Sequence, residues 1–193
     1  RLAEVACFVT PNLARQRYAR ERFGEHHPAS ADGFNGKGDS ATTILTTARG
    51  SVADVRVDAN SPRPHNMTHY VLQGTHAAYV SGRTREEDPL IWIDGRSPGV
   101  SPGDAAWQPL WDLAAEYEHP YWRAHGATAR EAGHGGGDYF IIQDFVSAIA
   151  EGVAPAIDVF DAVTWSSVYP LSAESVAQGG RPLAIPDFRR PTK

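Results

Sequence analysis

Short apolar runs separated by polar, glycine-containing connections fill the first half of the chain, a pattern typical of β-strands. The first run spans residues 2–9 (LAEVACFV). Two more, at 40–47 (SATTILTT) and 51–59 (SVADVRVDA), are separated only by Ala48-Arg49-Gly50. A connection this short that contains a glycine is typical of a hairpin, so we predict that these two strands pair antiparallel.

A second hairpin and a sixth strand are predicted further along the same half. Residues 69–72 and 76–80 flank Gln73-Gly74-Thr75, and residues 90–93 (LIWI) form another short apolar run. Between the first two strands lies a polar segment with an arginine-rich stretch, residues 14–22. This stretch predicts a surface helix whose mixed charges form a solvated face.

Apolar residues at helical spacing dominate the second half of the chain. They predict a helix within residues 104–122 that starts near Pro109, because a proline inside a helix costs about 3 kcal/mol. They also predict a strongly amphipathic helix over residues 138–151 and a further helix over 158–178 that is interrupted at Pro170.

Strands followed by helices predict an α+β fold with an open, mostly antiparallel sheet and helices packed on one face. The other face of such a sheet must be solvated or covered by a partner. The length fits a single domain over residues 1–193, in which the proline-rich tail from residue 181 is expected to be irregular.

Composition excludes several classes of function. The 18 Lys and Arg residues against 23 Asp and Glu give a net charge of −5, which argues against a general nucleic-acid or anionic-membrane binder. No apolar run approaches the length of a membrane span, and we expect a cytoplasmic protein. The single cysteine, Cys7, lies in an apolar run and is expected to be a buried, inert thiol outside any disulfide or zinc site.

Neither a nucleotide site nor a metal site is predicted. Gly133–Asp138 (GHGGGD) comes close to a dinucleotide fingerprint, but it follows a polar loop and has an aspartate at the last glycine position. His65 and His69 are four residues apart, yet neighbouring prolines favour an extended segment. The two imidazoles would then lie roughly 13 Å apart, too far to share one zinc ion.

Two segments are candidates for binding a polar ligand. In SPRPHN (61–66), two prolines stiffen the backbone around Arg63 and His65, although a stiff turn with an exposed arginine would look the same. In GHGGGD, the glycines allow a ligand close to the next helix, where Asp138 could be the N-cap and His134 could face a cleft. A flexible hinge with an ordinary cap is the alternative.

Three aromatic residues, Tyr117, Tyr121 and Trp122, surround Glu118-His119-Pro120. Flat apolar rings complement the faces of carbohydrates, so these residues could stack on a sugar, but packing in a core or an interface uses the same residue types. The chain has no G-x-S-x-G elbow, and its many carboxylates single out no glycosidase acid–base pair.

Six segments, in this order, resemble the C-terminal half of the Gfo/Idh/MocA oxidoreductase superfamily. The branch that they resemble most is glycoside hydrolase family 109, the NAD-dependent α-N-acetylgalactosaminidases and their relatives. The segments are Lys37-Gly38-Asp39, SPRPHN (61–66), YEHPYW (117–122), GHGGGDYF (133–140), DVFDAVTWSSVYPLS (158–172) and IPDF (185–188).

The resemblance implies a longer, two-domain parent protein. Family members have an N-terminal Rossmann domain that binds NAD, and the following α+β domain forms part of the sugar pocket and, in many members, the dimer contact. The implied chemistry is transient oxidation of the sugar at C3 by NAD, elimination of the glycosidic bond, addition of water and reduction of the ketone. The family's Rossmann fingerprint and its catalytic Tyr and His-Gly segment are missing here. We therefore expect no cofactor, no catalytic residue and no activity in this fragment alone.

By the same resemblance, six residues are expected to bind the substrate. They are Arg63, His65, His134, Asp138, Tyr117 and Lys37. Two departures from the family bear on which substrate is bound: His65 stands where relatives commonly have tyrosine, and Gly137 stands where many have methionine.

Three functions are consistent with the sequence. The first is the substrate-binding and oligomerisation domain of an NAD-dependent glycosidase, which would bind a carbohydrate, its own Rossmann domain and, through the sheet face, a second copy of itself. The second is the same domain of a Gfo/Idh/MocA sugar dehydrogenase. The third is a non-catalytic oligomerisation module.

Overall fold

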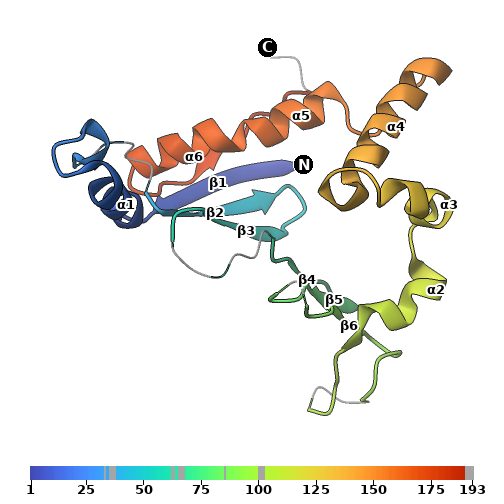
Figure 1. Cartoon of the computed structure of the whole chain (residues 1–193). Coiled ribbons are helices and arrows are strands. Elements are labelled where there is room, and N and C mark those ends of the chain that lie inside the picture. Colours follow the sequence, from blue (N-terminus) through green and yellow to red (C-terminus); the bar gives the residue numbers. More distant parts are fainter. Residues whose placement is uncertain are drawn as a thin grey trace. The chain divides into compact units, whose positions relative to one another are not determined.

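The computed structural model describes residues 1–32, 34, 38–61, 64, 68–84, 86–99 and 103–189. The chain divides into two compact units, and each has its own four-stranded antiparallel sheet (Figure 1). Unit 1 comprises residues 1–63 and 154–193, and unit 2 comprises residues 64–153. The predicted α+β class and antiparallel pairing are confirmed, with the strands shared between two sheets where one open sheet was expected.

The sheet of unit 1 has the strand order β3-β2-β1-β8. Strands β1 (Leu2–Val9) and β2 (Ser40–Thr47) match their predicted bounds, and β3 (Val52–Asp58) lies within the predicted run. The predicted hairpin joins β2 to β3 in a ladder in which Leu45 faces Ala53. Gly50 closes the turn with a φ of 86°, which a glycine adopts without strain.

Strand β8 (Leu183–Ala184) corrects the expectation of an irregular tail. It pairs antiparallel with Glu4 and Val5 on the outer edge of β1, and the N–H of Ile185 donates to the carbonyl oxygen of Ala3 at 2.8 Å. Strand β8 pairs with the edge of β1, almost 180 residues earlier in the sequence, so the local sequence pattern does not predict it.

Helices α5 (Val159–Ser166) and α6 (Val168–Ala177) run along one side of the unit 1 sheet (Figure 1). The core between the sheet and the helices consists of the buried residues Val5, Leu45 and Ile185. Leu171 of α6 and other partly buried side chains pack against it. Cys7 is buried as predicted and accepts a hydrogen bond on Sγ from the Thr43 hydroxyl at 3.2 Å.

The predicted interruption at Pro170 lies three residues earlier, at Ser167, where α5 ends and α6 begins. Pro170 occupies the first turn of α6, where a missing N–H is tolerated. The start of α5 carries a full capping box, in which Asp158 accepts from the Asp161 N–H and Asp161 accepts from the Asp158 N–H.

The arginine-rich helix is α1 (Leu13–Phe23), and its cap comes from a distant residue. Asn12 makes no capping bond, and the Asp39 carboxylate accepts the N–H groups of Leu13 and Ala14 at 2.6 Å each. These backbone bonds hold the pKa of Asp39 below its usual range. Gly38 has a φ of 73°, and a side chain there would collide with the Thr10 carbonyl. A short 3₁₀ turn, η1 (Pro28–Ser30), follows α1.

The sheet of unit 2 has the strand order β4-β5-β6-β7. Strands β4 (Val71–Gln73) and β5 (Ala77–Val80) form the predicted second hairpin, and β6 (Leu90–Ile93) is the predicted sixth strand. The unpredicted β7 (Gln108–Pro109) adds a two-residue edge.

The single helix predicted within residues 104–122 is divided into several short elements. They are β7, the 3₁₀ turn η2 (Leu110–Leu113), α2 (Ala114–Tyr117) and the start of α3 (Pro120–Ala129). Pro120 explains the break, because the residue before a proline avoids the helical region, and His119 has a ψ of 138°.

The predicted amphipathic helix is α4 (Gly137–Glu151), which follows the 3₁₀ turn η3 (His134–Gly136) and ends at Gly152 with a φ of 66°. No helix in the described parts of the chain is long and apolar enough to cross a membrane.

We expect Ser175→Ala to destabilise the protein by about 1–3 kcal/mol, because it leaves buried backbone groups without partners. Ser175 is fully buried, and its hydroxyl accepts from the Cys7 N–H at 3.0 Å and donates to the Arg181 carbonyl at 2.8 Å. Urea denaturation measures the loss.

The matched control is Ser172→Ala, three residues earlier on α6. The Ser172 Oγ is buried and has no hydrogen-bond partner among the described residues, so its removal should change stability by less than about 0.5 kcal/mol. Equal losses for the two variants would contradict the assigned role of Ser175.

Candidate functional site

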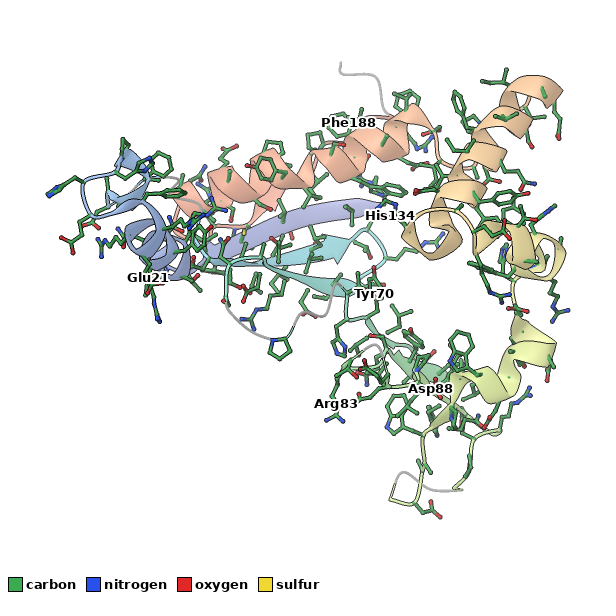
Figure 2. All side chains as sticks on the ribbon, viewed as in Figure 1. Glu21, Tyr70, Arg83, Asp88, His134 and Phe188 are labelled. Atoms are coloured by element: carbon green, nitrogen blue, oxygen red, sulfur yellow. The ribbon has the colours of Figure 1, made fainter. Side chains whose placement is uncertain are left out.

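The turn before α4 brings together two of the predicted site residues. His134 is labelled in Figure 2. Its Nδ1 lies 2.9 and 3.0 Å from the two carboxylate oxygens of Asp138. Among the described residues, His134 is the only non-glycine with a positive φ, 53°. Such a backbone conformation is unusual for histidine and is held here by the surrounding turn.

Glycine is required at residue 136 because of its neighbours. Gly136 has a φ of 99°, and a Cβ there would lie 2.7 Å from the Trp122 ring and 3.0 Å from the Ala129 carbonyl oxygen. Gly137 has an ordinary helical backbone and open space around it. The turn is therefore built tightly against the indole of α3, which argues against the flexible-hinge alternative.

The expected capping role of Asp138 is wrong. The N-cap of α4 is Gly136, and Asp138 lies in the first turn of the helix. Its carboxylate is directed to His134, although a negative charge in this position still interacts favourably with the helix dipole. A side chain at residue 133 would compete for the same space, because its Cβ would overlap the Asp138 carboxylate.

The imidazole of His134 is exposed and oriented by its partner. Its side chain is 80% exposed, and that of Asp138 is 49% exposed. The hydrogen bond and negative charge of Asp138 raise the pKa of His134 above its usual value. Because Asp138 binds Nδ1, the ring presents Nε2, which has no partner in the described part of the chain. When the ring is protonated, this nitrogen can donate a hydrogen bond to an oxygen of a ligand.

Tyr117, another predicted site residue, is held by a clamp that sequence analysis missed. Arg96, in the loop after β6, donates to both carboxylate oxygens of Glu116 at 2.9 and 2.6 Å and to the Tyr117 hydroxyl at 2.7 Å. These bonds lower the pKa of Glu116 to about 2. Glu116 and Tyr117 lie 20 and 21 residues after Arg96, a separation that matches no helical or strand spacing, so the sequence pattern did not indicate the clamp. The hydroxyl of Tyr117 is occupied, but its ring is 59% exposed.

A cavity of about 550 Å³ lies within unit 2, between β6 and the segment from η2 to α3. Apolar side chains of β6, η2 and α2 form most of its lining, together with three aromatic rings: Trp111, Tyr117 and Trp122. Since Trp122 also supports Gly136, the cavity and the His134 turn share one residue. The predicted aromatic group is thus divided, with Tyr117 and Trp122 on the cavity and Tyr121 stacked on Phe140.

Three predicted site residues, Arg63, His65 and Lys37, lie outside the described residues, and their roles stay predictions. The described residues contain no group of three or more His, Cys, Asp or Glu side chains placed to hold a metal ion. The glycine turn does not fit a dinucleotide site for NAD. Helix α3 comes before the turn, whereas a dinucleotide fingerprint requires a strand there.

We expect Gly136→Ala to destabilise the protein by about 2–4 kcal/mol, since it combines a positive φ with a collision against Trp122. Gly137→Ala serves as the control, and there we expect a gain of up to about 1 kcal/mol from reduced chain entropy. Thermal unfolding monitored by circular dichroism compares them. Similar effects of the two substitutions would contradict the tight packing of the turn.

We expect the pKa of His134, measured by NMR titration, to lie above that of an unpaired histidine and to fall in Asp138→Asn. Since the folded-state pKa is raised, the pair stabilises the fold fully below the ordinary pKa of histidine, about 6.5, and this contribution is lost as pH rises through the folded pKa. An unchanged pKa in Asp138→Asn would show that the contact does not form in solution.

Residues 1–192 match the family model described as the C-terminal domain of glycosyl hydrolase 109. The chain is 35% identical to a glycosyl hydrolase family 109 protein of Stenotrophomonas maltophilia (strain K279a), covering 97% of this chain and 39% of that protein. It is 30% identical to the alpha-N-acetylgalactosaminidase of Tannerella forsythia, covering 98% of this chain and 38% of that protein.

The fold is shared with levoglucosan dehydrogenase in complex with NADH, with a TM-score of 0.67 and 18% identity over 97% of this chain and 45% of that one. The chain spans about two-fifths of the length of the curated relatives that it matches. The resemblance predicted from the sequence is confirmed: the chain belongs to the C-terminal domain family of glycosyl hydrolase 109.

Proposed function

We propose that the chain is the substrate-binding part of a longer NAD-dependent glycosidase that acts on α-N-acetylgalactosaminides. The observation that carries the proposal is the His134–Asp138 pair, an exposed imidazole fixed in an unusual backbone conformation by a carboxylate. The name of the Tannerella forsythia relative supports the reaction type. In this proposal NAD binds to the part of the longer protein outside this chain.

The proposed role of His134 is to orient the sugar. With Nδ1 bonded to Asp138, the Nε2–H of the ring donates to a sugar oxygen, and the raised pKa keeps a larger fraction of the ring protonated near neutral pH. A protonated donor makes a stronger, charge-assisted hydrogen bond. Arg63, His65 and Lys37, which lie outside the described residues, stay proposed substrate-binding residues.

A contact between copies of the protein is also part of the proposal. Alternate residues of β1 and β2 point away from the core formed by Val5 and Leu45, and Ala6 and Ile44 are paired on that opposite face. Both are half-buried, so their side of the sheet is a candidate for contact with a second copy.

We expect His134→Ala in the longer protein to reduce hydrolysis of an aryl α-N-acetylgalactosaminide by about tenfold or more, the loss expected when one charge-assisted hydrogen bond to the substrate is removed. Circular dichroism checks that the variant is folded. The control is His76→Ala, because His76 is another exposed histidine of unit 2 and lies 3.8 Å from Asp94.

Equal activities of the two variants would refute the proposed role of His134. Accumulation of NADH with a sugar substrate, without release of the aryl group, would show instead that the longer protein is a dehydrogenase. The dehydrogenase alternative is consistent with the fold that this chain shares with levoglucosan dehydrogenase.

A further inference from the structure

We propose that the cavity of unit 2 is an accessory binding site for a neutral pyranose ring, separate from the sugar that contacts His134. The inference extends the proposed function, on which its place in the enzyme rests. The cavity volume of about 550 Å³ falls within the range of roughly 300–1,000 Å³ that is typical of small-molecule sites.

The aromatic walls of the cavity are held in place before any ligand binds. The Trp111 Nε1–H donates to Asp88 at 3.1 Å, while the Tyr117 hydroxyl is held by Arg96 at 2.7 Å. Trp111 and Tyr117 are nevertheless each 59% exposed. A ring that is fixed at its polar end and open on its face loses little entropy when a flat ligand stacks on it.

Trp122 forms the third aromatic surface. Its ring packs edge to face against Phe140 at a centroid distance of 4.9 Å, and the backbone of Gly136 lies close against it. The apolar floor between the rings is formed by Ile91, Ile93 and Leu113, which suits the C–H faces of a sugar.

The polar rim of the cavity contains two opposite charges. Arg130 stacks over Trp122 at 5.9 Å, and its guanidinium has no hydrogen-bond acceptor within the described ranges. The Glu118 carboxylate, also at the cavity, likewise has no donor there. The lining therefore carries one positive and one negative group whose charges cancel, so it gives neither an anionic nor a cationic ligand a net electrostatic advantage.

Hydroxyl groups meet the hydrogen-bonding demands of this rim. The His119 Nδ1 accepts the Tyr121 N–H at 3.2 Å, which places the proton of the neutral ring on Nε2 as a free donor. The rim therefore offers donors from Arg130 and His119 and an acceptor from Glu118. A sugar hydroxyl both donates and accepts, so a polyhydroxylated ring can pair with all three groups.

The test titrates the full chain with methyl α-N-acetylgalactosaminide and observes the indole N–H signals of its five tryptophans by NMR. We expect the largest shifts at Trp111 and Trp122. We also expect Trp111→Ala to weaken binding by about tenfold, while Trp107→Ala, at a half-exposed tryptophan of unit 2 outside the cavity, leaves it unchanged. Equal weakening by the two substitutions, or shifts spread evenly over all five indoles, would overturn the proposal.

A charge variant keeps the test decisive if Trp111→Ala is unfolded. Glu118→Gln removes the only negative charge of the cavity lining, so it should increase affinity for an anionic sugar such as N-acetylneuraminic acid relative to the neutral glycoside. An unchanged ratio of the two affinities would refute the assigned rim.

Failure of this inference is distinguishable from failure of the proposed function. Loss of sugar binding in Trp111→Ala with hydrolysis still dependent on His134 supports both proposals. Hydrolysis that depends on His134, without any binding at Trp111, overturns the accessory site alone. Binding at Trp111 in a protein that does not hydrolyse the glycoside overturns the proposed function alone.

Discussion

The contact between the Trp122 indole and the backbone of Gly136 is the constraint on which the candidate site depends. No other residue type has room at this position, so the chain must pass the ring in a left-handed conformation before α4 can begin. That path places His134, four residues before Asp138, close enough for the carboxylate to bind Nδ1. The same indole forms one wall of the cavity. The position of Trp122 therefore determines both the path of the glycine turn and the shape of the cavity.

Local pattern was sufficient wherever an element depends on its own residues. Strands β2 and β3 are an example, because two apolar runs joined by a short glycine-containing turn specify a hairpin from local sequence alone. Helix α4 is similar, since its apolar periodicity and Gly152 define its body and its end. The glycine turn is also predictable, because consecutive glycines before a helix cost conformational entropy and so indicate a turn that needs positive φ or close packing.

Contacts between distant residues were not predictable in this way. Strand β8 requires the open edge of β1, and α1 takes its cap from Asp39, although Asn12 at the usual capping position is a good capping residue type. The clamp of Arg96 joins residues of no recognisable spacing. An aspartate at the start of a helix is most often its N-cap, which is the role predicted for Asp138. In the structure its carboxylate binds His134 instead, and Gly136 is the N-cap.

Protonation links the strain of the turn to its chemistry. The backbone of His134 is held in a conformation that histidine rarely adopts, and its interaction with Asp138 offsets that cost. When the ring is charged, the pair combines a hydrogen bond with an ion pair; when it is neutral, only the hydrogen bond from Nδ1–H is left. Nε2 changes with it, from a charged donor to an acceptor. The ring can therefore donate to a sugar oxygen through Nε2 only in the protonation state in which the turn itself is held most firmly.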